Sequence, residues 1–152
     1  MRYTTRTEYG LMSLVHMALS PTKRVTIKEL SELECYSSSY IEKIFQSLRS
    51  AHIVDSFQGN QGGYALAREP KDITLKHIIE ALEGETFEVF CECHEVICNH
   101  PVGCSLKGIW KKTKGLLDEF YGSITLQDLA HQQRGAPQPF ITETQPSIRG
   151  NI

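Results

Sequence analysis

The residues most able to do chemistry in this 152-residue chain lie in one short segment, "CECHEVICNHPVGC", at residues 91–104. This segment holds four of the five cysteines and two histidines: Cys91, Cys93, Cys98, Cys104, His94 and His100. Thiols gathered in this way are typical of three structures: a disulfide staple, a structural zinc site and an iron–sulfur cluster.

The cysteine spacing narrows the chemistry only partly. Cys93, Cys98 and Cys104 are separated by four and five residues. Iron–sulfur clusters are held by cysteine thiolates, whereas zinc would accept the same cysteines together with His94 or His100. Zinc sites favour CxxC pairs that clamp one ion, and the sequence contains no such pair. The spacing alone leaves iron–sulfur and zinc equally open.

Composition and the N-terminal residues indicate the compartment. The chain is 40% hydrophobic, enough for one domain with a buried core. No apolar run approaches the roughly 18–20 residues needed to cross a bilayer, and "MRYTTRTEYG" lacks the layout of a secretory signal. We therefore expect a cytoplasmic protein with no membrane partner. Thiols stay reduced in the cytoplasm, and this argues against the disulfide staple. The net charge of −2 neither favours nor excludes nucleic acid.

Amphipathic helices in the first part of the chain could position a binding surface. Apolar residues recur at helical spacing over residues 7–20, 27–34 and 39–54. Thr26 with Glu29, and Ser39 with Glu42, fit the capping box that begins a helix. The second and third helices are joined by the few residues of "CYSS", which predicts a helix-turn-helix, with a plain helical hairpin as the alternative.

A β-hairpin follows these helices. "IVDSFQ" and "YALA" are typical of strands, and the glycine-rich "GNQGG" joins them. This is the layout of a winged helix, whose second helix enters the major groove of DNA while the wing touches the backbone or minor groove. The predicted fold class is therefore mainly α with a small β wing. The residues expected to contact DNA are polar groups of that helix and the wing: Ser38, Ser39, Tyr40, Lys43, Gln46, Gln58 and Asn60.

Two further helical regions flank the cysteine segment. "ITLKHIIEALEGE" predicts a helix, and a longer one is expected in "SLKGIWKKTKGLLDEFYGS". The longer helix carries an apolar stripe at positions 106, 109, 113, 116 and 120, widened by Trp110 and Leu117. Its polar side carries Lys107, Lys111, Lys114 and Asp118. So wide an apolar face predicts burial against both its own domain and a partner chain, and we expect a homodimer.

These elements suggest a division of the chain into four parts. We expect a winged helix-turn-helix domain (1–84), a cysteine loop (85–105), a dimerisation helix followed by a short helix (106–131), and a flexible tail (132–152). Cys35, between the two helices of the helix-turn-helix, is interpreted as a packed small residue.

With these segments in view, the chain resembles the IscR/NsrR family of bacterial winged-helix regulators that hold iron–sulfur clusters. The likeness runs from "MRYTT" to "SITLQDLA", and its specific parts are "SSSYIEKIFQSLRSAHIV", "GGYALA" followed by "ITLKHIIEALEG", and three cysteines before "LKGIW". The resemblance implies that three cysteines ligate a 2Fe–2S or 4Fe–4S cluster, and that cluster state controls binding of a homodimer to pseudo-palindromic operator DNA. It favours iron–sulfur over zinc.

The resemblance also indicates which residues are ligands. The spacing of Cys93, Cys98 and Cys104 is similar to that of the nitric-oxide-sensing NsrR branch, and a set starting at Cys91 fits less well. Some members place a histidine where this chain has Lys107. NsrR-like members instead carry an acidic residue in "TDYGL" that ligates the partner subunit's cluster, and this chain reads "TEYGL", which puts Glu8 at the matching place.

An alternative explanation of Glu8 is structural. Thr5 and Glu8 could form a capping box, and an acidic residue in the first turn suits the helix dipole.

Gln58 is a departure from the family, because members often have an arginine there for the minor groove, and glutamine brings no charge.

The sequence therefore predicts an iron–sulfur-dependent transcription regulator, expected to be a repressor, which responds to nitric oxide, redox state or iron and cluster supply. One alternative is the same scaffold with a structural zinc or a thiol switch. Another is a small redox or cluster-carrier protein, which would explain the cysteines but not the winged helix. No nucleophile–base pair or paired carboxylates indicate an enzyme.

Overall fold

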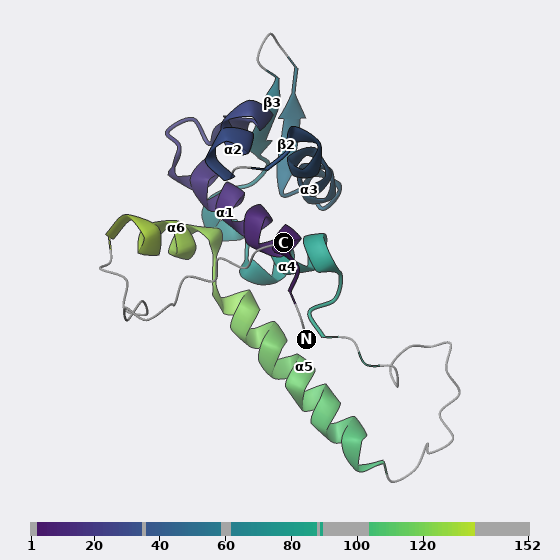
Figure 1. Ribbon diagram of the computed structural model, residues 1–152. Coiled ribbons are helices and arrows are strands. Elements are labelled where there is room, and N and C mark those ends of the chain that lie inside the picture. Colours follow the sequence, from purple (N-terminus) through teal and green to yellow (C-terminus); the bar gives the residue numbers. More distant parts are fainter. Residues whose placement is uncertain (1–2, 35, 59–61, 88, 90–103, 136–152) are drawn as a thin grey trace, which may run out of the picture.

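A computed structural model describes residues 3–34, 36–58, 62–87, 89 and 104–135 (Figure 1). In chain order the elements are α1 (Thr5–Leu19), β1 (Arg24–Thr26), α2 (Ile27–Glu34), α3 (Ser38–Ser50), β2 (Val54–Phe57), β3 (Gly63–Leu66), the 3-10 turn η1 (Pro70–Asp72), α4 (Leu75–Glu83), α5 (Ser105–Ser123) and α6 (Leu126–Gly135). This arrangement confirms the predicted fold class, a mainly helical chain with a small β wing.

The core lies where α1, α3 and α4 meet. Leu14, Phe45 and Ile78, one from each of these helices, are completely buried. Burial of each such side chain stabilises the fold by about 1.5–3 kcal/mol. Gly10 permits the close packing, because a Cβ added there would lie 2.5 Å from Cδ1 of Leu82. A larger residue at position 10 would therefore force a shift, either of the Leu82 side chain or of α1 itself.

The wing is an antiparallel sheet with strand order β1-β3-β2. The predicted hairpin of β2 and β3 is confirmed, and β1 is a third strand that the sequence pattern did not predict. Thr26 of β1 pairs with Gly63 of β3, and a Cβ on Gly63 would lie 2.3 Å from the carbonyl oxygen of Val25. Glycine at this position is therefore what allows β1 to pair with β3. Asn60, at the expected wing tip, lies outside the described residues.

Of the capping boxes suggested by the sequence, the one of Thr26 with Glu29 is confirmed. The Glu29 carboxylate accepts from the Thr26 backbone N–H at 2.7 Å, and Thr26 Oγ1 accepts from the Glu29 N–H at 3.1 Å. The box of Ser39 with Glu42 is wrong, because α3 begins at Ser38 and its N-cap is Ser37. Ser39 is therefore already inside the helix, past the position from which a side chain caps.

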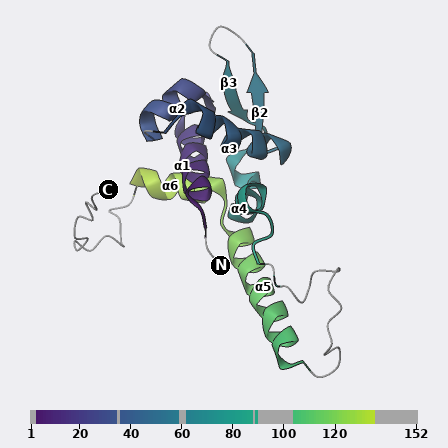
Figure 2. The ribbon, with the colours of Figure 1, turned by 45° about the vertical axis from the view of Figure 1, so that its right-hand side comes forward.

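Helix α5 extends away from the winged domain as an arm (Figures 1 and 2). No side chain of α5 is fully buried. Four residues along its apolar stripe are exposed: Leu106 by 49%, Ile109 by 54%, Leu116 by 59% and Phe120 by 59%. The chain's own domain thus leaves most of this stripe uncovered.

Helix α6 returns to the winged domain. Leu126 is completely buried and its backbone N–H donates to the Ile73 carbonyl at 2.8 Å. The Leu75 N–H donates to the Ile124 carbonyl at the same distance. These bonds fix the C-terminal end of α5 to the start of α4. Within the described ranges, no helix is long and apolar enough to span a bilayer.

Candidate functional site

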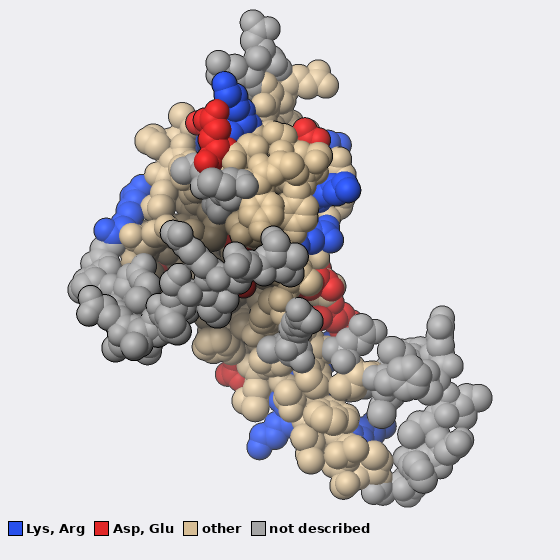
Figure 3. Space-filling model, in the orientation of Figure 1, with Lys and Arg blue, Asp and Glu red and all other residues tan. Residues whose placement is uncertain are grey.

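The outer face of α3 is polar and open to solvent. Ser38, Ser39, Lys43 and Gln46 are exposed, while Ile41, Ile44, Phe45 and Leu48 form the opposite, buried face. Lysine and arginine side chains are visible on the α3 side of the molecule (Figure 3). Gln58, which follows β2, is also exposed. The structure thus places on one exposed surface four of the α3 residues expected to contact DNA: Ser38, Ser39, Lys43 and Gln46.

Tyr40 differs from its neighbours on α3 because it is half-buried. Its hydroxyl lies 3.2 Å from Oγ1 of Thr5, at the start of α1. Its ring packs on Tyr36 at 5.4 Å between centroids, and Tyr36 packs on Tyr9 at 4.0 Å. These contacts connect the first turn of α3 to α1.

The turn between α2 and α3 is held by serine hydroxyls. Ser31 Oγ donates to the Tyr36 carbonyl at 2.8 Å and lies 3.1 Å from Ser38 Oγ. Such side-chain to backbone bonds replace the helical bonds that end at the turn. They set how α3 is presented relative to α2.

The candidate cluster ligands fall partly inside the described residues. Cys104 is exposed and is the N-cap of α5. Glu8 is exposed in the first turn of α1. Cys91, Cys93 and Cys98, like His94, His100 and Cys35, lie outside the described residues. In the part of the chain that is described, no three acidic, cysteine or histidine side chains are grouped as a metal site.

The capping box of Thr5 with Glu8 is wrong. The N-cap of α1 is Thr4, and no side chain of its own first turn accepts the capping bonds. The acceptor comes instead from the end of α4. Oε1 of Glu83 accepts from the Thr4 N–H at 3.0 Å, from Thr4 Oγ1 at 2.5 Å and from Thr7 Oγ1 at 2.5 Å.

This role of Glu83 was missed, because nothing near it in sequence marks it as a partner of α1. Partial burial alone would raise the pKa of Glu83, but the bonds from Thr4 and Thr7 and the charge of Arg6 outweigh it and lower the pKa. Glu8 is left without a capping function and its carboxylate is open to solvent.

The C-terminal half of α5 is tied to α4 and to the residues that lead into the cysteine segment. Asp118 accepts from Thr86 Oγ1 at 2.8 Å and pairs with Lys76 Nζ at 3.3 Å. The Thr86 bond, opposed by burial and helped by Lys76, lowers the pKa of Asp118. Lys114 pairs with Glu85. These are residues of the helix's polar side, and they connect it to the chain's own domain.

The two ends of α5 lie far apart, and the candidate ligands are near opposite ends. Tyr3 Oη donates to Tyr121 Oη at 2.7 Å, which holds the start of α1 at the C-terminal end of α5. Cys104 is at the N-cap position, at the other end of α5. At 1.5 Å per residue, Ser105 and Tyr121 are separated by roughly 24 Å along the helix. Glu8 and Cys104 of one chain are therefore at different ends of the arm.

An exposed polar helix, held by a short turn beside a three-stranded wing, defines this chain as a winged-helix, DNA-binding transcriptional regulator. The chain belongs to the Rrf2 family, described as iron-dependent transcriptional regulators, whose model matches residues 3–132. The resemblance found in the sequence is thereby confirmed.

Individual relatives agree with this assignment. An HTH-type transcriptional regulator of Neisseria meningitidis serogroup A is 31% identical over 134 residues, which are 88% of this chain and 90% of the relative. The structure of CymR, the global cysteine regulator of B. subtilis, has a TM-score of 0.70 and 30% identity, and the match covers 86% of this chain and 97% of CymR. IscR of T. potens has a TM-score of 0.66 and 32% identity, and the match covers 88% of each chain.

Proposed function

We propose that this chain is a homodimeric, iron–sulfur-dependent repressor that acts in the cytoplasm. Cys93, Cys98 and Cys104 of one subunit and Glu8 of the partner subunit hold the cluster, and Cys91 is the less favoured first ligand. The observation that carries the proposal is the exposure of Cys104 and Glu8 near opposite ends of α5. The family's description as iron-dependent and the likeness to IscR support it.

The arrangement of α5 explains why Glu8 would come from the partner. Closed dimers are commonly two-fold symmetric, and two α5 helices that cross in opposite directions bring the start of one beside the end of the other. Cys104 of one chain then meets the α1 start of its partner. Within one chain, the roughly 24 Å length of α5 keeps the two apart.

The exposed stripe of α5 supports the dimer. Leu106, Ile109, Leu116 and Phe120 are each about half exposed. Contiguous apolar surface of this kind on a helix indicates a protein–protein contact. A second copy of the chain, laid against the stripe, would cover it.

The donor set fits an iron–sulfur cluster. Such a cluster supplies electron transfer and reactivity toward small molecules when bound to cysteine thiolates. The Glu8 carboxylate is a harder ligand than a thiolate and is expected to exchange more easily. A change at Glu8 would act on α1, whose first turn contacts α3 through Thr5 and Tyr40. This is a direct route from the ligand to the DNA-binding helix.

On the DNA side, α3 would enter the major groove of a pseudo-palindromic operator. Ser38, Ser39, Tyr40, Lys43 and Gln46 supply donors and acceptors for bases and phosphates. Gln58 and Asn60 would contact DNA from the wing, with Gln58 contributing a hydrogen bond but no charge.

An anaerobic absorption spectrum with iron and sulfide analysis tests the cofactor. We expect sulfide-to-iron charge-transfer bands and stoichiometric sulfide. A colourless protein that contains zinc, or a metal-free protein that reacts only through its thiols, would replace the cluster with one of the two alternatives.

Mixed dimers test ligation across the interface. Glu8→Gln alone is expected to alter the spectrum or speed cluster loss in oxygen, and Cys98→Ala alone to abolish the cluster. A mixed dimer of the two variants holds one site with both defects and one intact site. Partial recovery of the native spectrum is therefore expected. No recovery, with mixed dimers shown to form, would remove the case for a ligand from the partner.

A further inference from the structure

A hollow of about 510 Å³ lies between the start of α1 and the outer face of α3. Six of its lining residues are polar: Arg6, Tyr40, Lys43, Gln46, Ser47 and Ser50. Two of these are cationic, and none of the described lining residues carries a carboxylate. The hollow is therefore suited to an anion with several oxygen atoms.

Arg6 is the residue that distinguishes this hollow from an ordinary polar surface. Its Nη2 donates to Oγ of Ser47, on α3. Its Nε is buried and, among the described residues, has no hydrogen-bond acceptor. This Nε is itself shielded from solvent, but Arg6 as a whole lines the hollow and supplies a positive charge there.

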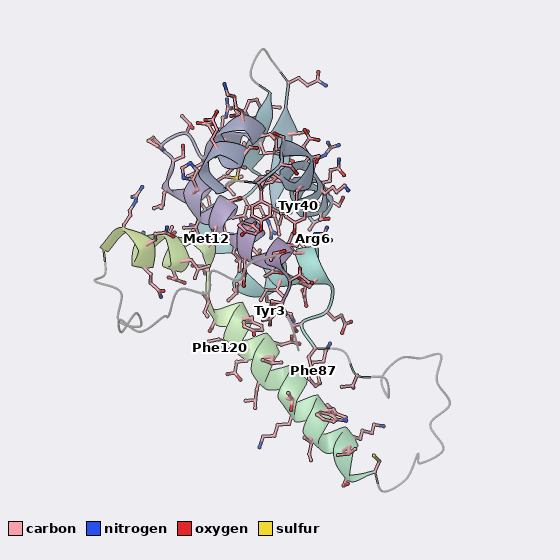
Figure 4. All side chains as sticks on the ribbon, in the orientation of Figure 1. Tyr3, Arg6, Met12, Tyr40, Phe87 and Phe120 are labelled. Carbon is pink, nitrogen blue, oxygen red and sulfur yellow. The ribbon has the colours of Figure 1, made fainter. Side chains whose placement is uncertain are left out.

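Among the described residues, no acidic side chain forms a salt bridge with Arg6. Glu83 is close enough for Arg6 to lower its pKa. However, Oε1 of Glu83 accepts its bonds from Thr4 and Thr7. In Figure 4, Arg6 and Tyr40 lie at the junction of α1 with α3, where the hollow opens.

The position beside α3 indicates the anion. The major groove is about 12 Å wide, and an α-helix with its side chains is 10–12 Å across, so a helix in the groove has phosphates along both flanks. Lys43 and Gln46 line the hollow and also belong to the face of α3 expected to meet DNA. The hollow lies at the α1 side of that face, which is where a flanking phosphate would be when α3 is in the groove.

We infer that this hollow binds a backbone phosphate of DNA and that Arg6, outside the helix-turn-helix and the wing, is its principal charged ligand. The guanidinium presents donors in a planar fork that matches phosphate oxygens. Ser47 orients the guanidinium, and Lys43 adds a second positive charge. The inference rests on the proposed docking of α3 on DNA, and it adds a contact that gives affinity without sequence preference.

The salt dependence of DNA binding by Arg6→Gln tests the inference. The probes are a 30-base-pair duplex selected from a random pool by the wild-type protein and a scrambled duplex of equal length. Each neutralised phosphate contributes about 0.9 to the slope of log affinity against log salt concentration. A dimer has two such hollows, so Arg6→Gln is expected to reduce the slope by roughly 2 and to weaken both duplexes by a similar factor.

Three variants separate charge from structure. Arg6→Lys keeps the charge and should retain most of the slope. Ser47→Ala removes the bond to Arg6 but no charge, and should leave the slope unchanged. Lys71→Gln removes one exposed charge in η1, which contacts α6, and should change neither slope nor affinity appreciably. If Arg6→Gln unfolds, Ser50→Asp places a negative charge in the hollow while leaving Arg6 intact, and should weaken both duplexes.

Distinct results overturn the inference and the proposed function. Two results would remove the phosphate site alone, provided that the wild type binds DNA. The first is a salt slope in Arg6→Gln equal to that of the wild type, and the second is DNA binding by Ser50→Asp that is not weakened. If the wild type selects no duplex from the random pool, both the phosphate site and the proposed DNA-binding function are removed. Calorimetric titration of inorganic phosphate into DNA-free protein distinguishes the source of the anion. Submillimolar binding that Arg6→Gln abolishes, combined with unchanged DNA slopes, would assign the hollow to a free anion instead.

Discussion

Replacing Leu116 with glutamate should break the proposed dimer. Leu116 is 59% exposed at the middle of the apolar stripe of α5. Full burial of a leucine side chain stabilises by about 1.5–3 kcal/mol, so covering its exposed half contributes about 0.8–1.5 kcal/mol. In a symmetric dimer the substitution counts twice, about 1.5–3 kcal/mol, which is a roughly 10- to 100-fold weaker dimer. Two unpaired carboxylates brought into an apolar contact add to this cost.

Sedimentation equilibrium over a range of protein concentrations measures the effect. Leu116→Glu is expected to sediment as a monomer where the wild type is dimeric, with unchanged helical circular dichroism. Lys111→Glu is the matched control. It adds a carboxylate to α5 at an exposed position about 140° around the helix from Leu116. A dimer that is as stable in Leu116→Glu as in the wild type would refute the assignment of the stripe to the subunit contact.

Three further predictions concern single residues. Glu83→Ala should lower the free energy of unfolding by about 1 kcal/mol at neutral pH, because Thr4 and Thr7 lose their shared acceptor. Since the native pKa of Glu83 is lowered, this contribution is complete above the ordinary glutamate pKa and is lost as pH falls through the lowered one. Urea unfolding at pH 7 and pH 3 should show the difference shrinking in acid, and a constant difference would contradict the capping role. Gly115→Ala should raise the melting temperature by about 2–4 °C, because a Cβ at position 115 meets no atom within 4 Å and alanine favours the helix more than glycine does. A lower melting temperature would mean that this face of α5 is covered. Lys43→Ala should weaken binding to the selected duplex without changing the melting temperature, and equal affinity would remove Lys43 from the DNA contact.

The sequence by itself determined the elements whose cause is local. The box of Thr26 with Glu29 joins residues three apart, and the buried face of α3 follows from helical spacing. The hairpin was predictable because glycines interrupt two short runs of residues typical of strands. The family resemblance could also be read from the sequence, because the helix, hairpin and cysteine segments that carry it are defined by residue types and spacing.

Only the tertiary structure decided which residues meet across the chain. Oε1 of Glu83 caps α1 from 76 and 79 positions away in sequence, so the local box of Thr5 with Glu8 does not form. Strand β1 has three residues, too few to show alternation, and exists because β3 lies beside it. Arg6 reaches Ser47 because Gly10 lets α1 pack closely against α3 and α4. Such contacts depend on how helices pack against one another, and no local pattern of residues encodes that packing.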